Sequence, residues 1–125
     1  MPKQKLIGIV DDDPDLPTAL SSLVRSMGYQ ARCFSSAVDF LSNSSFDAYS
    51  CVISDIHMPV VTGLELTRRL KTIAPELPVI LMTGRPERGL EETALKSGAV
   101  SFFAKPFSTN VLIANLSKVF GERLD

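Results

Sequence analysis

The sequence is poor in residues that bind transition metals or form disulfides. It contains two cysteines, Cys33 and Cys51, and one histidine, His57. A zinc site made of Cys and His side chains needs more such ligands than the chain can bring together. Both cysteines lie in apolar, strand-like runs. We therefore expect them to be buried free thiols.

The sequence also lacks an excess of positive charge and any long apolar run. Its net charge is −1, and Lys and Arg do not cluster. Nucleic-acid binding needs a basic face, so we expect none by this domain itself. No run approaches the roughly 18 apolar residues that span a bilayer, and the N-terminus lacks the features of a signal peptide. We expect no membrane association and a cytoplasmic location.

The length and composition are those of one globular domain. The chain has 125 residues, of which 45% are hydrophobic and 22% charged. A chain of this length can bury one sizeable core. No internal repeat, low-complexity segment or linker is visible. We expect residues 1–125 to form a single domain.

Short apolar runs alternate five times with segments of helical periodicity. Asp13 is the expected N-cap of the first helix, with Pro14 at its first position and Gly28 after its end. Ser35 or Ser36 and, later, Ser108 are expected to cap two further helices. The predicted strands are 6–10, 30–34, 51–54, 79–82 and 101–104, and the predicted helices lie within 14–27, 35–41, 64–73, 86–98 and 109–120.

Five strand–helix units with short connections indicate an α/β fold with helices on both faces of a parallel sheet. Right-handed crossovers leave few topologies. We predict a doubly wound five-stranded parallel sheet with the order 2-1-3-4-5. In such sheets, ligands bind at the carboxyl ends of the strands, beside the switch point between the first and third strands.

Polar side chains stand at the ends of four of these predicted strands. Each has an ordinary explanation, because an Asp after a strand is often a helix cap and a Thr before Gly is often part of a turn. Coincidence at several strand ends is improbable. These residues, which the predicted fold gathers at one edge of the sheet, are Asp11, Asp12, Asp13, Asp55, Thr83 and Lys105.

This set of side chains suits phosphoryl transfer. Carboxylates held close together repel and either take up protons or recruit a cation. Hard oxygen ligands favour Mg²⁺, which keeps several waters and leaves room for phosphate oxygens. Lys105 can neutralise a phosphoryl oxygen and Thr83 can donate a hydrogen bond to one. The attacking group would be a carboxylate, which gives an aspartyl phosphate.

Four motifs lie at the predicted strand ends: Ile-Val-Asp-Asp-Asp at 9–13, Ser-Asp-Ile-His-Met-Pro at 54–59 with Gly63, Met-Thr-Gly at 82–84 and Ala-Lys-Pro-Phe at 104–107. In these motifs, and over essentially its whole length, the sequence resembles bacterial response-regulator receiver domains, the switches of two-component systems, which have a flavodoxin-like fold. The likeness is closer to regulators of the nitrogen-fixation type, as residues 34–37 and 40–41 indicate.

The resemblance implies a role for each residue of the acidic motifs. Asp55 would accept the phosphoryl group from a sensor histidine kinase. Asp12 would bind Mg²⁺ directly, and Asp11 mainly through water. Asp55 itself and the backbone carbonyl of His57 would complete the protein's metal ligands. The chain would be a signalling domain that assists its own phosphorylation and dephosphorylation, not an enzyme that turns over a substrate.

Further roles follow from the same resemblance. Lys105 would contact the phosphoryl oxygens, and its bond to Pro106 is usually cis in the family. Thr83 would move toward the phosphoryl group and Phe102, the aromatic switch residue, would swing inward. The face made by the fourth helix, fifth strand and fifth helix would carry the signal to an output, expected to be transcription. Relatives usually carry a C-terminal DNA-binding domain, and this chain is either a stand-alone receiver or part of a longer regulator.

A charged stripe on the fourth predicted helix leaves two interpretations open. Arg88, Glu92 and Lys96 recur at four-residue spacing. They can form intrahelical pairs, or Glu92 of one chain can meet Lys96 of another in a two-fold dimer. Regulators of the nitrogen-fixation type form dimers after phosphorylation through a similar face, and this resemblance keeps a phosphorylation-dependent homodimer as the second interpretation.

Three other classes of protein fit less well. A phosphatase of the haloacid-dehalogenase type needs a second Asp two positions after its nucleophile, where this chain has His57. A flavodoxin-like FMN carrier needs N–H donors after its first strand, where three aspartates would repel the phosphate. A degenerate receiver that acts only in docking would lack some of the motif residues, and here they are all present.

Overall fold

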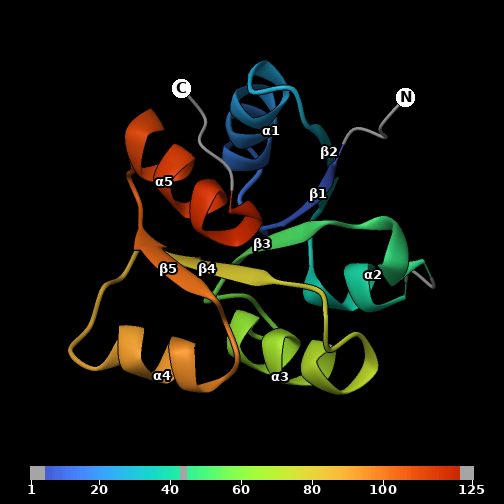
Figure 1. Cartoon of the computed structure of the whole chain (residues 1–125). Coiled ribbons are helices and arrows are strands. Elements are labelled where there is room, and N and C mark those ends of the chain that lie inside the picture. Colours follow the sequence, from blue (N-terminus) through green and yellow to red (C-terminus); the bar gives the residue numbers. More distant parts are fainter. Residues whose placement is uncertain (1–4, 43–44, 122–125) are drawn as a thin grey trace.

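In the computed structural model, which describes residues 5–42 and 45–121, five parallel strands form one sheet with the order β2-β1-β3-β4-β5. Helices cover both faces of the sheet (Figure 1). The predicted fold class and strand order are therefore confirmed. The elements are β1 (Leu6–Val10), α1 (Leu16–Ser26), β2 (Gln30–Phe34), α2 (Ala37–Leu41), the 3-10 helix η1 (Phe46–Ala48), β3 (Cys51–Asp55), α3 (Gly63–Ile73), β4 (Val79–Thr83), α4 (Leu90–Lys96), β5 (Ser101–Ala104) and α5 (Thr109–Phe120).

The sheet separates two hydrophobic cores. Every residue of β3 and β4 is buried, as expected for central parallel strands covered on both faces. Because side chains alternate along a strand, Ile53 packs with Leu20 and Leu112 in the core under α1 and α5. Val52 packs in the second core, under α2, α3 and α4. Figure 1 shows α1 and α5 on one side of the sheet and α3 and α4 on the other.

Side-chain caps fix where three of the helices begin. The hydroxyl oxygens of Ser36, Thr62 and Ser108 each accept a hydrogen bond from the backbone N–H three residues later. Each cap satisfies an N–H group that has no partner inside its helix. The caps at Ser36 and Ser108 were predicted. After α1, Gly28 has a φ of 94°, which confirms it as the left-handed residue that follows this helix.

The predicted start of the first helix is wrong by two residues. α1 begins at Leu16, and its N-cap residue, Asp15, makes no side-chain capping bond. The carboxylate of Asp13 instead accepts from the N–H groups of Asp15 and Leu16, at 2.8 and 3.3 Å. These bonds form a side-chain turn that includes Pro14 and precedes the helix. They also lower the pKa of the Asp13 carboxyl below its ordinary value.

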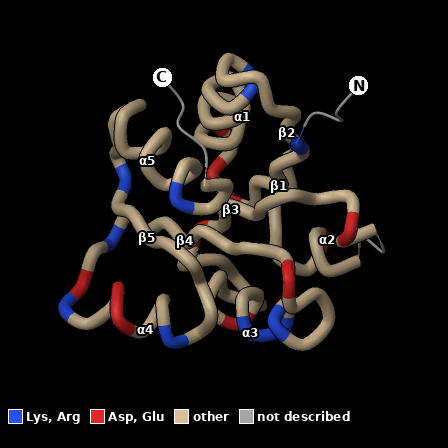
Figure 2. The backbone as a smooth tube through the Cα atoms, viewed as in Figure 1, with Lys and Arg blue, Asp and Glu red and all other residues tan. Residues whose placement is uncertain are grey.

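The fourth helix was predicted to begin at Pro86 but begins at Leu90. Gly89 has a φ of 82°, and this left-handed conformation interrupts the helical path between Pro86 and Leu90. Arg88 is therefore outside the helix and not part of a helical stripe. Within α4, Lys96 Nζ lies 2.9 Å from Glu92 Oε1, which is the intrahelical alternative. Figure 2 shows acidic and basic positions along this helix.

The two cysteines differ in burial. Cys51 is a buried free thiol in central strand β3, and burial raises its pKa to about 12. Cys33 is a free thiol too, but it is exposed, so its predicted burial is wrong. β2 is an edge strand with little of its surface covered, which explains the difference. In the part of the chain that the structure describes, no helix is long and apolar enough to cross a membrane.

Candidate functional site at the carboxyl edge of the sheet

Strands β1, β3, β4 and β5 bring the predicted polar residues to one edge of the sheet. Asp11 follows β1, Asp55 ends β3 and Thr83 ends β4, while Lys105 follows β5. The strand register aligns Asp55 with Met82 and Thr83 with Ala104. Carboxylate oxygens of Asp11, Asp12 and Asp55 all lie within 4.8 Å of one another.

Lys105 lies between the two buried carboxylates. Its Nζ atom is 3.3 Å from Asp11 Oδ2 and 3.5 Å from Asp55 Oδ1. Asp11 is 1% exposed and Asp55 is 6% exposed, whereas Asp12 is exposed to solvent. The other oxygen of Asp11, Oδ1, accepts from the Asp13 N–H at 2.9 Å. One ammonium is therefore shared by two carboxylates, with a third beside them.

The site leaves negative charge on Asp55 incompletely compensated. Burial raises the pKa of the Asp55 carboxyl, and the neighbouring Asp11 carboxylate raises it further. Lys105 opposes these effects, but the direction remains upward. Asp55 Oδ1 is buried and makes no hydrogen bond with the described residues. A site of this kind stabilises a proton or an added cation.

The start of α3 holds the acceptor loop in place. The N–H of Gly63 donates to the carbonyl of Ile56 at 2.8 Å. A Cβ atom at Gly63 would lie 2.2 Å from the backbone oxygen of Asp55, closer than any real contact. A side chain would therefore push α3 away from β3. The sequence motif included Gly63, but nothing in the sequence revealed that the reason is this backbone contact.

The predicted switch residues, Thr83 and Phe102, differ in their surroundings. Thr83 is fully buried, and its Oγ1 atom accepts a hydrogen bond from the Arg85 N–H at 2.9 Å. Phe102 lies opposite Leu81 in β5, two positions before the strand ends. It is half-buried and packs against the core under α2, α3 and α4.

Two further features surround the site. His57 Nε2 is buried and has no hydrogen-bond partner among the described residues. The Lys105–Pro106 peptide bond is cis, as the resemblance implied. Val60, which the sequence did not single out, has a φ of 70° and is 92% exposed. Pro59 is a turn signal, but a valine after it gives no indication of a positive φ.

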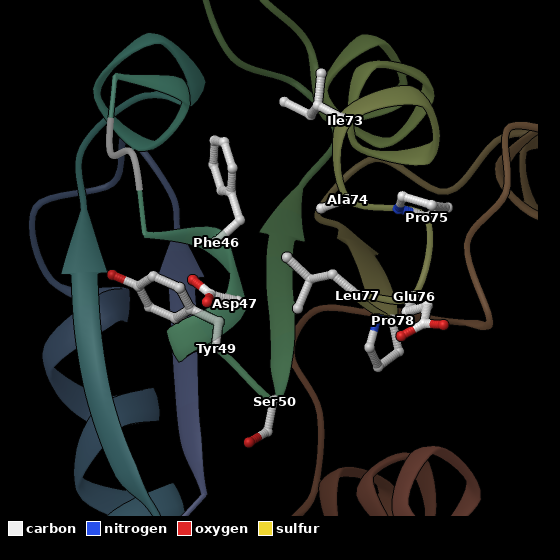
Figure 3. Close-up of a pocket in the computed structure, with 10 residues that line it drawn as sticks. All are labelled: Phe46, Asp47, Tyr49, Ser50, Ile73, Ala74, Pro75, Glu76, Leu77 and Pro78. Atoms are coloured by element: carbon white, nitrogen blue, oxygen red, sulfur yellow. The ribbon is translucent and has the colours of Figure 1, made fainter.

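A pocket of about 620 Å³ lies at the opposite end of the sheet and is separate from this site. Figure 3 shows it between η1 and the connection from α3 to β4. It contains none of the predicted functional residues. Its lining residues are Phe46, Asp47, Tyr49, Ser50, Ile73, Ala74, Pro75, Glu76, Leu77 and Pro78.

A five-stranded parallel sheet with aspartates, a threonine and a lysine at its carboxyl edge defines a signalling class of α/β domain. Residues 7–117 match the family model described as "Response regulator receiver domain". The chain belongs to this family of two-component receiver domains, and the predicted resemblance is confirmed.

Particular relatives support this assignment. The chain is 41% identical over 111 residues to the response regulator protein TodT of Pseudomonas putida, covering 89% of this chain and 49% of TodT. It is 36% identical over 108 residues to the transcriptional regulatory protein FixJ of Bradyrhizobium diazoefficiens, covering 86% and 53%. The BeF3-activated receiver domain of DrrB has a TM-score of 0.86 at 26% identity, covering 96% of this chain and 100% of that one. The chain spans about half the length of TodT and FixJ.

Proposed function

We propose that this chain is a phosphorylation-activated switch, with residues 1–125 as one receiver domain, and that Asp55 accepts a phosphoryl group from a sensor histidine kinase. The observation that carries this proposal is the state of Asp55. Its carboxylate is buried at the end of β3, has one oxygen without a hydrogen bond, and lies beside a lysine and two further aspartates. A nucleophile with charge-neutralising groups around it is what phosphoryl transfer requires.

The residues present fit a bound Mg²⁺. Asp11, Asp12 and Asp55 offer hard oxygen donors within 4.8 Å of one another, and Asp55 Oδ1, which makes no hydrogen bond with the described residues, is available to a cation. We propose Asp12, Asp55 and the backbone carbonyl of His57 as direct ligands, with Asp11 acting mainly through water. When bound, Mg²⁺ supplies charge neutralisation and orientation for the phosphoryl oxygens.

The chemistry of Asp55 then follows from the charges around it. An ionised Asp55 oxygen attacks the phosphorus of a phosphohistidine; the new O–P bond forms as the P–N bond breaks, and the leaving imidazole keeps the electron pair. Before phosphorylation, Lys105 is shared between Asp11 and Asp55. During transfer it pairs with a phosphoryl oxygen. Thr83 gives up the hydrogen bond from Arg85 and donates to another phosphoryl oxygen.

The signal is read on the face made by α4, β5 and α5. Thr83 is the last residue of β4, and the neighbouring strand β5 carries Phe102. We propose that movement of Thr83 draws Phe102 inward and so changes this face, as a local charge change biases a two-state element. The output is proposed to be transcription, through a DNA-binding domain joined to the receiver, because FixJ is a transcriptional regulatory protein.

The simplest experiment on this function is phosphorylation by a small donor. Acetyl phosphate with Mg²⁺ should add one phosphoryl group to the chain, detected by intact-mass spectrometry, and chelation of Mg²⁺ should prevent it. A chain that stays unmodified with Mg²⁺ present would contradict the proposed function.

The metal ligands are tested separately by calorimetric titration of Mg²⁺. Asp12→Ala should lose most of its Mg²⁺ affinity and remain folded, because Asp12 is exposed and supports no core packing. Asp47→Ala removes an exposed acid at the far end of the sheet and should bind Mg²⁺ as the wild type does. Equal affinities in all three proteins would refute the ligand set.

A further inference from the structure

The loop between β3 and α3 holds Val60 in a rare conformation. Its φ is 70°, and no other non-glycine residue that the structure describes has a positive φ. The N–H of Val61 donates to the carbonyl of Pro59 at 2.8 Å, so Val60 is the central residue of a γ-turn of the strained, positive-φ type. A β-branched residue resists this conformation. Such strain persists only where the surroundings impose it, and it concentrates at functional sites.

The same loop presents the Val60 side chain to solvent. Val60 is 92% exposed, and the next most exposed large apolar residue in the described ranges, Ile73, is 53% exposed. Met58 and Val61 on either side are buried, at 6% and 5% exposure. The loop is thus anchored before and after Val60, and the valine forms a fixed apolar projection.

The position of this projection limits what it can contact. Val60 belongs to the loop that leaves Asp55, and the end of that loop, at Gly63, lies against the Asp55 backbone. A protein that delivers a phosphoryl group to Asp55 must cover this edge of the sheet, including the loop. A small donor enters the site without covering it. An exposed apolar residue here can therefore contribute only to the binding of a macromolecular donor.

We propose that Val60 is a specificity residue for the phosphodonor, inserting into an apolar depression on the histidine-bearing domain of the sensor kinase. This inference rests on the proposed phosphorylation of Asp55. Exposed polar residues lie at the same carboxyl edge of the sheet, with Asp12 and Asp13 after β1 and Thr62 in the Val60 loop. One buried apolar contact within a polar rim is the usual arrangement of an energetically important interface residue.

The test compares a protein donor with a small one. Val60→Asn keeps a residue that tolerates positive φ while removing the apolar side chain. The protein donor is a kinase fragment radiolabelled on its histidine and chosen because it phosphorylates the wild-type chain. We expect kcat/KM for transfer from this fragment to fall about tenfold, the loss of one apolar contact. The rate with acetyl phosphate and Mg²⁺ should not change. Val60→Gly should behave in the same way.

Ile73→Asn is the matched control, because Ile73 is an exposed apolar residue at the end of α3 far from Asp55. Ile73→Asn should be phosphorylated at the wild-type rate by both the kinase fragment and acetyl phosphate. Wild-type transfer rates from the kinase fragment in both Val60 variants would overturn the inference. An equal loss with both donors would also overturn it, because Val60 would then shape the Asp55 site itself. A wild-type chain that neither donor phosphorylates would instead overturn the proposed function.

Discussion

Asp55 combines burial with a nearby carboxylate, and both raise its pKa above the ordinary value of 3.8. A raised pKa means that the folded chain holds this proton more tightly than the unfolded chain does. Asp55 therefore contributes stability while it is protonated, and this contribution is lost as the pH rises through the raised pKa. At neutral pH without metal, the ionised carboxylate destabilises the fold.

Asp55→Asn should consequently raise the stability of the metal-free protein at pH 7, because the amide carries no charge. Urea unfolding in the presence of a chelator measures this difference. The stability gain of Asp55→Asn should shrink as the pH is lowered below the raised pKa of Asp55. Added Mg²⁺ should reduce the same gain at neutral pH. A constant difference between the two proteins from neutral to acidic pH would contradict the electrostatic explanation.

Gly63 provides a steric test of how the acceptor loop is held. Gly63→Ala places a methyl group 2.2 Å from the Asp55 backbone oxygen, and backbone must shift to relieve the clash. We expect a loss of stability of about 1–3 kcal/mol, the usual effect of overpacking. Gly84→Ala is the control: its Cβ would meet Lys105 Cε at 3.6 Å, an ordinary contact. Similar unfolding midpoints for Gly63→Ala and Gly84→Ala would contradict this role.

Single residues also mark the limit of what the sequence could predict. Asp11, Asp55, Thr83 and Lys105 were placed correctly because each follows or ends an apolar strand, and parallel strands bring such ends together. Their burial could not be predicted, since it depends on packing between distant segments. The strained Val60 carries no sequence signal, because valine is typical of strands and not of left-handed turns.

At the scale of the elements, helix starts depend on local capping chemistry. In α5, Ser108 Oγ accepts from the Val111 N–H at 3.2 Å. Ser108→Ala should lower the free energy of unfolding by about 1 kcal/mol, the typical value of a cap. Thr109→Ala, at the exposed first position of the same helix, should be neutral or slightly stabilising, because alanine has the higher helix propensity. Denaturant titrations of both variants measure their free energies of unfolding. Equal changes in the two variants would rule out the capping role of Ser108.

The elements themselves were largely predictable, since central strands are continuous apolar runs and helices repeat apolar residues at helical spacing. The errors fall at two helix starts. Pro14 and Pro86 each looked like a first helical residue, but Pro14 lies in a turn before α1 and Pro86 precedes the turn before α4. Asp13 closes the first turn with its carboxylate, and Gly89 forms the second with a left-handed backbone. Either geometry competes with a helix start and uses the same residue types.

For the whole molecule, the face made by α4, β5 and α5 is the proposed route to self-association. Glu92 and Lys96 pair within α4, but their side chains are 71% and 76% exposed, so the pair adds little stability and can exchange partners. We predict that the chain sediments as a monomer alone and as a dimer with the phosphoryl mimic beryllofluoride. Lys96→Glu should weaken the dimer, and adding Glu92→Lys should restore it. A monomer in both states would remove the dimer proposal and leave the switch standing.

The most direct test of phosphorylation at Asp55 is the chemical location of the phosphoryl group. After reaction with acetyl phosphate and Mg²⁺, borohydride reduction should convert a phosphorylated aspartate to homoserine, which peptide mass spectrometry can locate. We predict homoserine at position 55 in the wild type, none at Asp11, Asp12 or Asp13, and no stoichiometric phosphorylation of Asp55→Asn. Homoserine at another aspartate of the wild-type chain, or full phosphorylation of Asp55→Asn, would contradict Asp55 as the phosphoryl acceptor.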